Sequence, residues 1–439
     1  MNRINAHDKD LNVFITISDE YAYKQARQAD EIIANNPNAF SEFPLLGVVM
    51  GLKDMYLTKG IRTTAGSKVL ENYKPQYSAT TVERFEKAGA IIIGKLNQDA
   101  WAHGASGENS DFGPTKNPWN NDYVPGGSSS GSAVTVAANF SLAAMGTDTG
   151  GSIRQPASFN NVVGLKPTYG SVPRYGVIAM ASSLDCMGHF THTVEDSVRI
   201  FNVTRGQDAK DATVKFAGEF ADTKKYTIGI PKEYFVEGTN LEVISIIKQA
   251  QEVLEKQGIT VKEISLPHTR HAVAVYYIIM SAEVSSNLAR YTGVRFGKTR
   301  DHFGDEAKRR IMLGSYVLSS GYYDAYYLQA MKVSTKLRQD FENAFNEVDA
   351  ILAPVSPTPP FKIGEKVNDP LQMYLADILT VAANLAGVPG ISVPAGFTDT
   401  GLPVGFQLLG NHFSENTLFE IGKLYQQQTS WHEKQPDLK

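Results

Sequence analysis

Residues 125 to 170 constrain the fold of this chain more than any other stretch. They read PGGSSSGSAVTVAANFSLAAMGTDTGGSIRQPASFNNVVGLKPTYG, in which two clusters of Gly and Ser enclose an apolar run rich in Ala and Val. That run is long enough for a short helix from Ala133 to Asn139 and a buried strand from Leu142 to Gly146. The two clusters are therefore expected to be turns attached to buried elements.

The second cluster, Gly150 to Ser152, has the composition of a catalytic turn. Glycine allows backbone conformations that other residues avoid, and it lets a ligand approach the main chain closely. Successive free N–H groups in such a turn can converge on one point and hold an anion. Ser152 at the end of the turn would then be a nucleophile beside an oxyanion hole.

Three other interpretations of this stretch are less well supported. A flexible Gly/Ser linker would not enclose an apolar run and precede the buried-looking VVGL. A phosphate-binding loop of the Walker type needs a Lys that GGSSSGS lacks. A Ser-His-Asp triad needs a suitably placed histidine, and His103, His189 and His192 have no such setting.

Lys53 is the better candidate for the base that a serine nucleophile requires. It follows the apolar run from Leu45 to Leu52, which predicts a buried strand. Burial disfavours a charged lysine, so its pKa should fall, and a neutral lysine can accept a proton. The alternative is an ion pair with the adjacent Asp54, or a solvated lysine just past a strand, and for Lys53 taken alone that is the simpler explanation.

The pairing of GGSSSGS with GTDTGGSIRQP resembles the amidase signature family, and the resemblance runs from about Leu45 to the C-terminal region. It implies a base at Lys53, a serine in a cis peptide at Ser128 and a nucleophile at Ser152. It further implies an oxyanion hole and a set of supporting residues. The oxyanion donors would be the N–H groups of Thr149, Gly150, Gly151 and Ser152, and the supporting residues Ser129, Asp148 and Arg154.

Further motifs are similar to the branch of A subunits of tRNA-dependent amidotransferases: DTGGSIRQPA, VGLKPTYG, SSLD, KRRI, SSGYYDAYY and NLAGVPGISVP. The resemblance implies that Tyr276, Arg310 and Asp377 hold free glutamine. A guanidinium can grip the α-carboxylate at two points, and a carboxylate can meet the α-ammonium. Each of these residues taken alone would be a surface ion pair or a core tyrosine.

The same resemblance implies a division of labour. This chain would release ammonia from glutamine with no cofactor or metal of its own. A B subunit would bind mischarged Glu-tRNA or Asp-tRNA, use ATP and Mg²⁺, and receive the ammonia through a tunnel, and a small C-type subunit would complete the assembly. The alternatives are a stand-alone amidase for another small amide and a catalytically silent scaffold subunit.

Composition limits the remaining choices. A formal net charge of −4 gives no electrostatic case for direct nucleic-acid binding. The single cysteine, Cys186, excludes an intramolecular disulfide and fits a reducing compartment. The acidic N-terminal stretch argues against a signal or transit peptide, and no apolar run has the length of a membrane span. We therefore expect a cytoplasmic protein, in preference to one of the mitochondrial matrix.

The expected fold is α/β, a single amidase-signature domain over residues 1–439 with a mixed central β-sheet covered by helices on both faces. Its core would be residues 45–210 and 345–430, with an α/β and helical subregion at 222–345. No entry helix is expected at the N-terminus, and the Tyr-rich segment 321–327 is expected in the core or an interface. Helices are predicted at 19–35, 80–90, 241–257, 273–289, 308–348 and 415–426, and strands at 90–94, 175–180, 259–266, 350–354 and 390–394.

Overall fold

The structure is a computed structural model that describes residues 1–215, 225–235, 238–295, 297–367 and 370–438. The start of the predicted subregion, residue 222, lies outside the described residues, as does the end of the predicted domain at residue 439. The proposed division into a core and a subregion therefore stays a prediction.

Eleven strands of the described residues form one mixed sheet, in the order β1-β3-β2-β4-β6-β5-β10-β11-β9-β7-β8. Parallel pairs, such as β2 with β3 and with β4, occur beside antiparallel pairs such as β4 with β6. The strands are β1 (Phe14–Ile17), β2 (Val49–Lys53), β3 (Ile91–Leu96), β4 (Ala143–Asp148), β5 (Val163–Lys166), β6 (Cys186–Thr191), β7 (Thr227–Pro231), β8 (Thr260–Ile264), β9 (Ala350–Pro354), β10 (Gly390–Phe397) and β11 (Pro403–Gly410).

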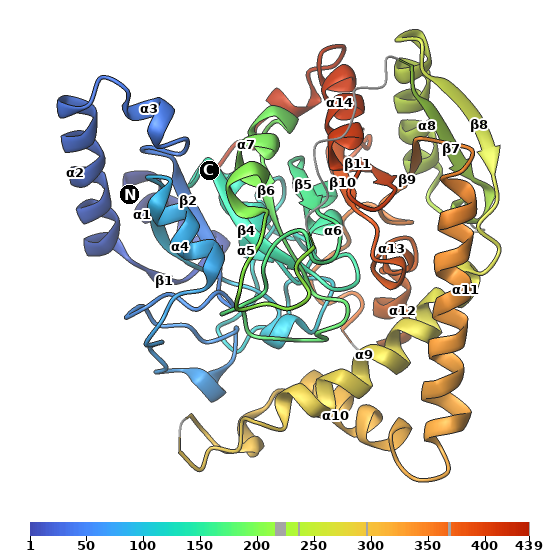
Figure 1. Cartoon of the computed structure of the whole chain (residues 1–439), viewed down its shortest axis with the longest axis horizontal. Helices are drawn as coiled ribbons and strands as arrows, with labels where there is room; N and C mark the ends of the chain where they lie inside the picture. The colour runs from blue at the N-terminus through green and yellow to red at the C-terminus, as the bar shows by residue number, and fades with distance from the viewer. Residues whose placement is uncertain (216–224, 236–237, 296, 368–369, 439) are drawn as a thin grey trace.

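Helices cover both faces of this sheet (Figure 1). They are α1 (Asn2–Leu11), α2 (Asp19–Asn35), α3 (Ala39–Glu42), α4 (Thr80–Lys87), α5 (Ser130–Ala137), α6 (Arg154–Asn160), α7 (Val194–Thr204), α8 (Leu241–Lys256), α9 (Ala272–Leu288), α10 (Asp305–Val317), α11 (Gln329–Ala344), α12 (Pro370–Leu375), α13 (Val381–Ala386) and α14 (Glu415–Gln426). The α/β fold class is confirmed.

Successive side chains of a strand point to opposite faces of the sheet, and both faces are buried along central strands such as β3, β4 and β6. The edge strands β1 and β8 are partly exposed. Along β3, Ile92 packs in one hydrophobic cluster, whereas Ile91 and Ile93 pack in another. The first cluster lies under α4, α7, α8 and α14, and the second lies under α5. A third cluster joins α9, α11 and α13 to the sheet beside β9. This layering leaves the strand ends as places where polar side chains can meet.

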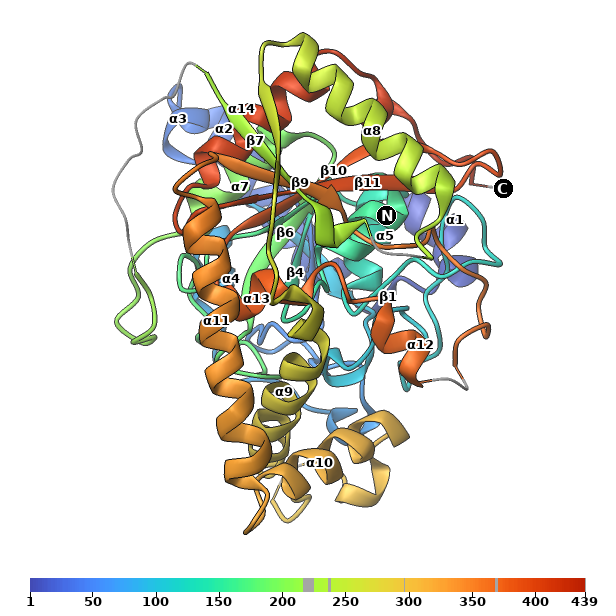
Figure 2. The same ribbon diagram turned by 90° about the vertical axis from the view of Figure 1, so that its right-hand side faces the viewer.

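Helices α9, α10 and α11 extend away from one end of the sheet, as two perpendicular views show (Figures 1 and 2). Helix α9 packs against α10, α11 and α13, so it links this helical extension to the body of the molecule. The Tyr-rich segment lies at its tip as a π-helix, Tyr323–Leu328, with Tyr322, Tyr323 and Tyr326 exposed. The core alternative of that prediction is therefore wrong, because the turn between α10 and α11 leaves these rings at the surface, and the interface alternative stays a prediction.

Two other expectations are wrong. Residues 175–180 form no strand, since only an isolated bridge joins Val177 to Tyr56. The N-terminus does begin with a helix, α1, whose Ile4 and Leu11 are buried. Most helix predictions are confirmed, with α2 and α14 at the expected bounds, although 308–348 is interrupted between α10 and α11. Among the described residues, no helix is both long and apolar enough to cross a membrane.

Candidate active site

The sheet brings Lys53 and the two serine turns together at one edge. Lys53 is the last residue of β2, which runs parallel to β4 with Leu52 opposite Met145. Because parallel strands end at the same edge, the turn after β4 that carries Ser152 lies beside Lys53. Ser128 precedes α5, and its peptide bond with Gly127 is cis. Lys53 and Ser128 are fully buried, and Ser152 is 9% exposed.

Lys53 contacts three hydroxyl groups. Its Nζ lies 2.8 Å from Ser128 Oγ, 3.0 Å from Ser129 Oγ and 2.8 Å from Thr147 Oγ1. Burial lowers the pKa of Lys53 to about 7, against the opposing charges of Asp99, Asp148 and Asp185. The sequence predicted that burial would lower the pKa of Lys53, and burial is the largest cause of the shift. Asp54 pairs with Lys95 at 3.2 Å, so the alternative ion pair with Lys53 does not form.

Of these three hydroxyl groups, Ser128 is the one that can donate its proton to Lys53. Ser129 Oγ donates to the Thr147 carbonyl at 3.1 Å, and Thr147 Oγ1 donates to Met55 Sδ at 3.9 Å. Both hydroxyls therefore have their protons engaged elsewhere and accept from Lys53. A neutral amine has two hydrogens and one lone pair. The lone pair is thus left for Ser128, whose hydroxyl has no other acceptor among the described residues.

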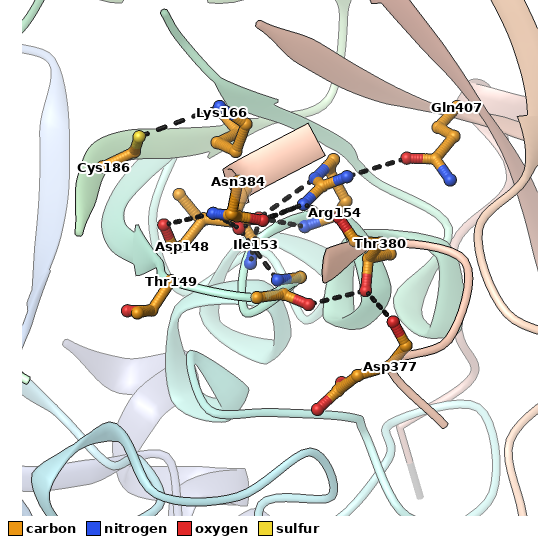
Figure 3. A network of polar contacts seen from close by, with 12 residues as sticks. Asp148, Thr149, Ile153, Arg154, Lys166, Cys186, Asp377, Thr380, Asn384 and Gln407 are labelled. Atoms are coloured by element: carbon orange, nitrogen blue, oxygen red, sulfur yellow. Dashed lines mark hydrogen bonds and ion pairs between the residues drawn. The ribbon is translucent and has the colours of Figure 1, made fainter. Parts of the chain in front are cut away.

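The turn after β4 is fixed by side chains on two sides (Figure 3). Asp148 Oδ1 accepts the Gly151 N–H at 2.8 Å, and Asp148 Oδ2 accepts the Ile153 N–H at 3.1 Å. Thr380 Oγ1 donates to the Gly150 carbonyl at 2.6 Å. The Gly151 N–H was expected in the oxyanion hole, but in this conformation it is occupied. The N–H groups of Gly150 and Ser152 have no acceptor among the described residues.

Asp148 is itself held by a buried network around Arg154 (Figure 3). The Arg154 guanidinium lies 3.2 Å from Asp148 Oδ1 and donates to Asn384 Oδ1 at 2.7 Å and Gln407 Oε1 at 2.9 Å. Burial alone would raise the pKa of Asp148, but Arg154 and its neighbours lower it to about 2. Asp148 thus stays ionised, as a carboxylate that clamps two backbone N–H groups requires.

The three predicted glutamine-binding residues lie on α9, on α10 and just after α12. The hydroxyl end of the Tyr276 ring packs against Gly150, where an added Cβ would be 2.7 Å from its hydroxyl oxygen. Arg310 and Asp377 are bridged by Tyr277, a residue that the sequence did not single out. The Arg310 guanidinium lies 5.5 Å over the Tyr277 ring, and the Tyr277 hydroxyl donates to Asp377 Oδ2 at 3.3 Å.

A cavity of about 510 Å³ opens beside Arg310, with Tyr277, Glu306 and Tyr374 in its wall. Gly104 to Ser106 form another part of the wall, and the Ser106 N–H lies against Gly127 of the cis peptide. Arg310 Nε donates to Glu306 Oε1 at 2.8 Å and Nη1 donates to Met280 Sδ at 3.4 Å, while Nη2 has no hydrogen-bond acceptor among the described residues. The cavity is large enough for an amino acid, and it approaches the first serine turn through Ser106. Ser152, Tyr276 and Asp377 are not in its wall.

The predicted site residues thus form two adjoining groups, one around Lys53 and one around Arg310. The hydroxyls of Ser128 and Ser152 do not hydrogen-bond to each other in this structure. Residues that the sequence reasoning left without a role, but which hold the site, are Asp99, Thr147, Asp185, Tyr277, Glu306, Thr380, Asn384 and Gln407. Thr147, Asp185 and Asn384 stand in the motifs GTDTGGSIRQP, SSLD and NLAGVPGISVP, which could have pointed to them.

The three histidines weighed as catalytic bases make no hydrogen bond to Ser128 or Ser152 among the described residues, although His103 lies in the wall of the cavity. His103 is buried and its pKa is lowered by burial and by Arg310. His189 contacts Ser197 at 2.7 Å, which is away from the serine turns. Within the described part of the chain, no group of three or more His, Cys, Asp or Glu side chains is placed to hold a metal ion.

Comparison with known proteins places this site in a family. The sequence profile of the amidase family matches residues 1–419. The A subunit of the glutamyl-tRNA(Gln) amidotransferase of Carboxydothermus hydrogenoformans is 51% identical over 100% of this chain and 94% of that protein. The equivalent protein of Geobacter metallireducens is 52% identical over 98% of this chain and 92% of that protein. The chain therefore belongs to the amidase family.

Solved structures agree with the sequence comparison. The crystal structure of the A subunit of glutamyl-tRNA(Gln) amidotransferase from Thermotoga maritima matches with a TM-score of 0.81 at 39% identity, over 96% of each chain. A 6-aminohexanoate cyclic dimer hydrolase matches with a TM-score of 0.88 at 22% identity, which shows the shared fold alone. Within the family, the relatives of about 50% identity over the full length are thus amidotransferase A subunits.

Proposed function

We propose that this chain is the glutaminase subunit of a tRNA-dependent amidotransferase, which hydrolyses glutamine and supplies ammonia for the conversion of Glu-tRNA(Gln) to Gln-tRNA(Gln). The observation that carries the proposal is the buried Lys53, 2.8 Å from the Ser128 hydroxyl and with a pKa lowered to about 7. The full-length similarity to A subunits supports the choice of reaction.

The reaction begins with the neutral Lys53 amine. It takes the proton of Ser128, which in turn takes the proton of Ser152, and Ser152 Oγ attacks the side-chain amide carbon of glutamine. Binding of glutamine is expected to bring the Ser128 and Ser152 hydroxyls into contact. The carbonyl oxygen becomes an oxyanion that accepts the N–H groups of Gly150 and Ser152, with Thr149 as a further donor.

The tetrahedral intermediate then collapses. The C–N bond breaks, and the relay returns a proton to the leaving nitrogen so that ammonia departs, which leaves a glutamyl ester on Ser152. Water attacks the ester with the same relay as base, and glutamate is released. Gly151 has a structural role here, because its N–H holds Asp148 at 2.8 Å and so fixes the curvature of the turn.

Glutamine is recognised by its amino-acid end. Arg310 offers its outer nitrogens to the α-carboxylate, and Asp377 meets the α-ammonium. Tyr276 packs against the turn at Gly150, and Tyr277 positions Arg310 and Asp377 relative to each other by contacting both. Glu306 orients Arg310 from behind by accepting its Nε–H. A simple amide needs none of this set, which favours glutamine as substrate.

The acceptor half of the reaction belongs to partners. A B subunit would bind the mischarged Glu-tRNA, or Asp-tRNA, and use ATP and Mg²⁺ to activate the side-chain carboxylate, and a small C-type subunit would hold the two together. We place the assembly in the cytoplasm, where the single, buried Cys186 stays reduced.

The test is ammonia release from glutamine by the purified chain, alone and with co-expressed partner subunits, ATP and mischarged tRNA. We expect release that rises with the partners and disappears in Ser152→Ala. Arg310→Ala should raise the KM for glutamine and leave the hydrolysis of butyramide unchanged.

Two results would overturn the proposal. Brisk hydrolysis of simple amides without partners, indifferent to Arg310→Ala, would identify a stand-alone amidase. Full amidotransferase activity of the complex with Ser152→Ala, with glutamine as the sole nitrogen source, would identify a silent scaffold subunit.

A further inference from the structure

Asp185 is a buried carboxylate with no role in the reaction derived above. It lies directly before β6 and is 5% exposed. Its Oδ2 accepts the Met180 N–H at 2.9 Å, and its Oδ1 accepts the Ala181 N–H at 3.1 Å. These two backbone contacts hold the carboxylate in place, so a further group that donates to it is held in place as well.

That remaining side holds Thr149, the first residue of the turn that ends at Ser152. The Thr149 hydroxyl donates to Asp185 Oδ1 at 2.8 Å, and Thr149 is itself buried. On the other side of the turn, Asp148 holds Gly151 and Thr380 holds Gly150. The Thr149 hydroxyl is therefore the contact by which the start of the turn is anchored to a different segment of the chain.

We propose that Asp185 is a positioning residue of the amide hydrolysis, which holds the oxyanion turn through Thr149 and presents its negative charge to Lys53. The inference rests on the proposed function, since it concerns the same turn and the same lysine. Asp185 touches neither the substrate nor the reacting atoms, so its effects must appear through Thr149 and through Lys53.

Other charged groups surround this pair. Lys53 faces Asp99 from the loop after β3, Asp148 from the end of β4, and Asp185, and each raises the pKa of Lys53 against the effect of burial. Asp185 itself faces Glu283 of α9, Arg174 of the loop after β5, Tyr276 and Cys186. Burial raises the pKa of Asp185 to about 6, so the carboxylate is largely ionised at neutral pH.

When the charge of Asp185 is removed, the direction in which the acidic limb of the pH profile moves distinguishes the proposal from a simple loss of packing. The acidic limb of kcat against pH, measured with glutamine bound so that Asp377 is paired with the α-ammonium, reports protonation of Lys53. Loss of the Asp185 charge should let the pKa of Lys53 fall further, so the limb should move to lower pH. A loosened structure would instead admit water to Lys53, raise its pKa and move the limb to higher pH.

The experiment compares Asp185→Asn, Thr149→Val, Thr149→Ser and the double variant Asp185→Asn/Thr149→Val in the full chain with its partners. We expect Asp185→Asn to lower kcat for glutamine roughly tenfold or more, with little change in KM, and to move the acidic limb to lower pH. Thr149→Val should lower kcat without moving the limb, and Thr149→Ser should restore most of that loss. The double variant should lose no more kcat than Asp185→Asn alone.

The matched control is Asp340→Asn, which removes another buried carboxylate, one that binds the backbone and ring of His268 on the far side of α11. It should leave both kcat and the acidic limb unchanged. The proposal would be overturned if Asp185→Asn had the kcat and the acidic limb of the wild type, or if its acidic limb moved to higher pH. Additive losses of kcat in the double variant would also overturn it. A wild-type complex with no glutaminase activity would overturn the proposed function instead.

Discussion

At the scale of single residues, the account depends on the protonation state of Lys53. Burial lowers the pKa of Lys53 to about 7, and its three hydroxyl partners are satisfied by a neutral amine. The lysine is the base only when it is neutral, so activity should rise as the pH increases through about 7. An ordinary lysine, with a pKa near 10.4, would be protonated over this whole range.

The first prediction concerns this pH dependence. The kcat at saturating glutamine, where Asp377 is paired with the α-ammonium, should show an acidic limb near pH 7. Lys53→Arg should lower activity by roughly 10²–10⁴-fold at every pH, because a guanidinium stays protonated. The measurement is steady-state ammonia release between about pH 5.5 and 9, a range that brackets the limb. An active Lys53→Arg variant with an unchanged limb would exclude Lys53 as the base.

The second prediction concerns Asp148, whose charge is paired with Arg154 inside the protein. Asp148→Asn should lower the free energy of unfolding by about 3 kcal/mol, because it leaves the Arg154 guanidinium buried without its partner. The exposed pair of Lys262 and Glu347 provides the control, and Glu347→Gln should cost less than about 1 kcal/mol. Urea unfolding at pH 7 gives both values, and similar losses in the two variants would contradict the account.

The pH dependence of that stability follows from the sign of the shift. The folded pKa of Asp148, about 2, lies below its ordinary value, so the carboxylate stabilises the fold above pH 4 or so and the contribution is lost as the pH falls toward 2. The difference in the free energy of unfolding between wild-type protein and Asp148→Asn should therefore shrink as the pH falls across that acidic range.

The sequence predicted the reacting residues better than the residues that hold them. Lys53, Ser128 and Ser152 stand in motifs with fixed spacing, and the structure brings them to one edge of the sheet. Thr380 and Gln407 carry no such signal, because a buried polar side chain is defined by partners far away along the chain. Arg154, for example, binds Gln407 across 253 residues of sequence.

At the scale of elements, the site depends on how closely α9 approaches the turn after β4. The hydroxyl end of the Tyr276 ring lies against Gly150, and an added Cβ there would be 2.7 Å from both its hydroxyl oxygen and its Cζ. This contact leaves no room for a side chain. It also explains why a glycine is needed at a position where the turn makes a close approach to a helix.

The third prediction follows from this contact. Gly150→Ala should push Tyr276 and the turn apart and lower kcat/KM for glutamine roughly 10²-fold, since displacements of about 1 Å have effects of that size. Gly304→Ala is the control, because its added Cβ would meet only Asp111 Oδ1 at 3.7 Å. Equal kinetics of Gly150→Ala and wild type, with circular dichroism to confirm folding, would contradict the packing argument.

The fourth prediction concerns the neighbouring residue of α9. Tyr277→Phe removes the donor to Asp377, whose pKa burial raises to about 7. Without this hydrogen bond Asp377 should be more often protonated and should hold the α-ammonium less well. The KM for glutamine should rise roughly fivefold, about 1 kcal/mol, with kcat little changed. Isothermal titration of glutamine into Ser152→Ala with and without Tyr277→Phe measures the same loss directly, and equal affinities would contradict it.

Local patterns predicted elements that have their own periodicity and missed those that do not. Helices α2 and α14 were expected at their observed bounds, since apolar residues recur on one face of each. Strands β6 and β11 were missed because they are buried on both faces and so lack an alternating pattern, and β1 was missed because it has only four residues. Residues 175–180 were wrongly assigned as a strand, because an apolar run in a loop can also be buried, as Ile178 and Met180 are.

At the scale of the whole molecule, the sheet order could not be predicted from the sequence. Strand β5 pairs with β10 across more than 200 residues, and β11 returns between β10 and β9. This order places α13, which carries Asn384, beside the turn after β4, and it seats α9 and α10 over the cavity. The helical extension thus supplies substrate contacts, and the sheet supplies the reacting groups.

The most direct test of the central claim is to trap the covalent intermediate. The complex, quenched in acid during turnover of glutamine and then digested, should yield a glutamyl ester on the peptide that carries Ser152, and Ser152→Ala should yield none. Mass spectrometry of the peptides locates the ester. A label on Ser128 or Ser129, or rapid ammonia release from the Ser152→Ala complex, would contradict the account.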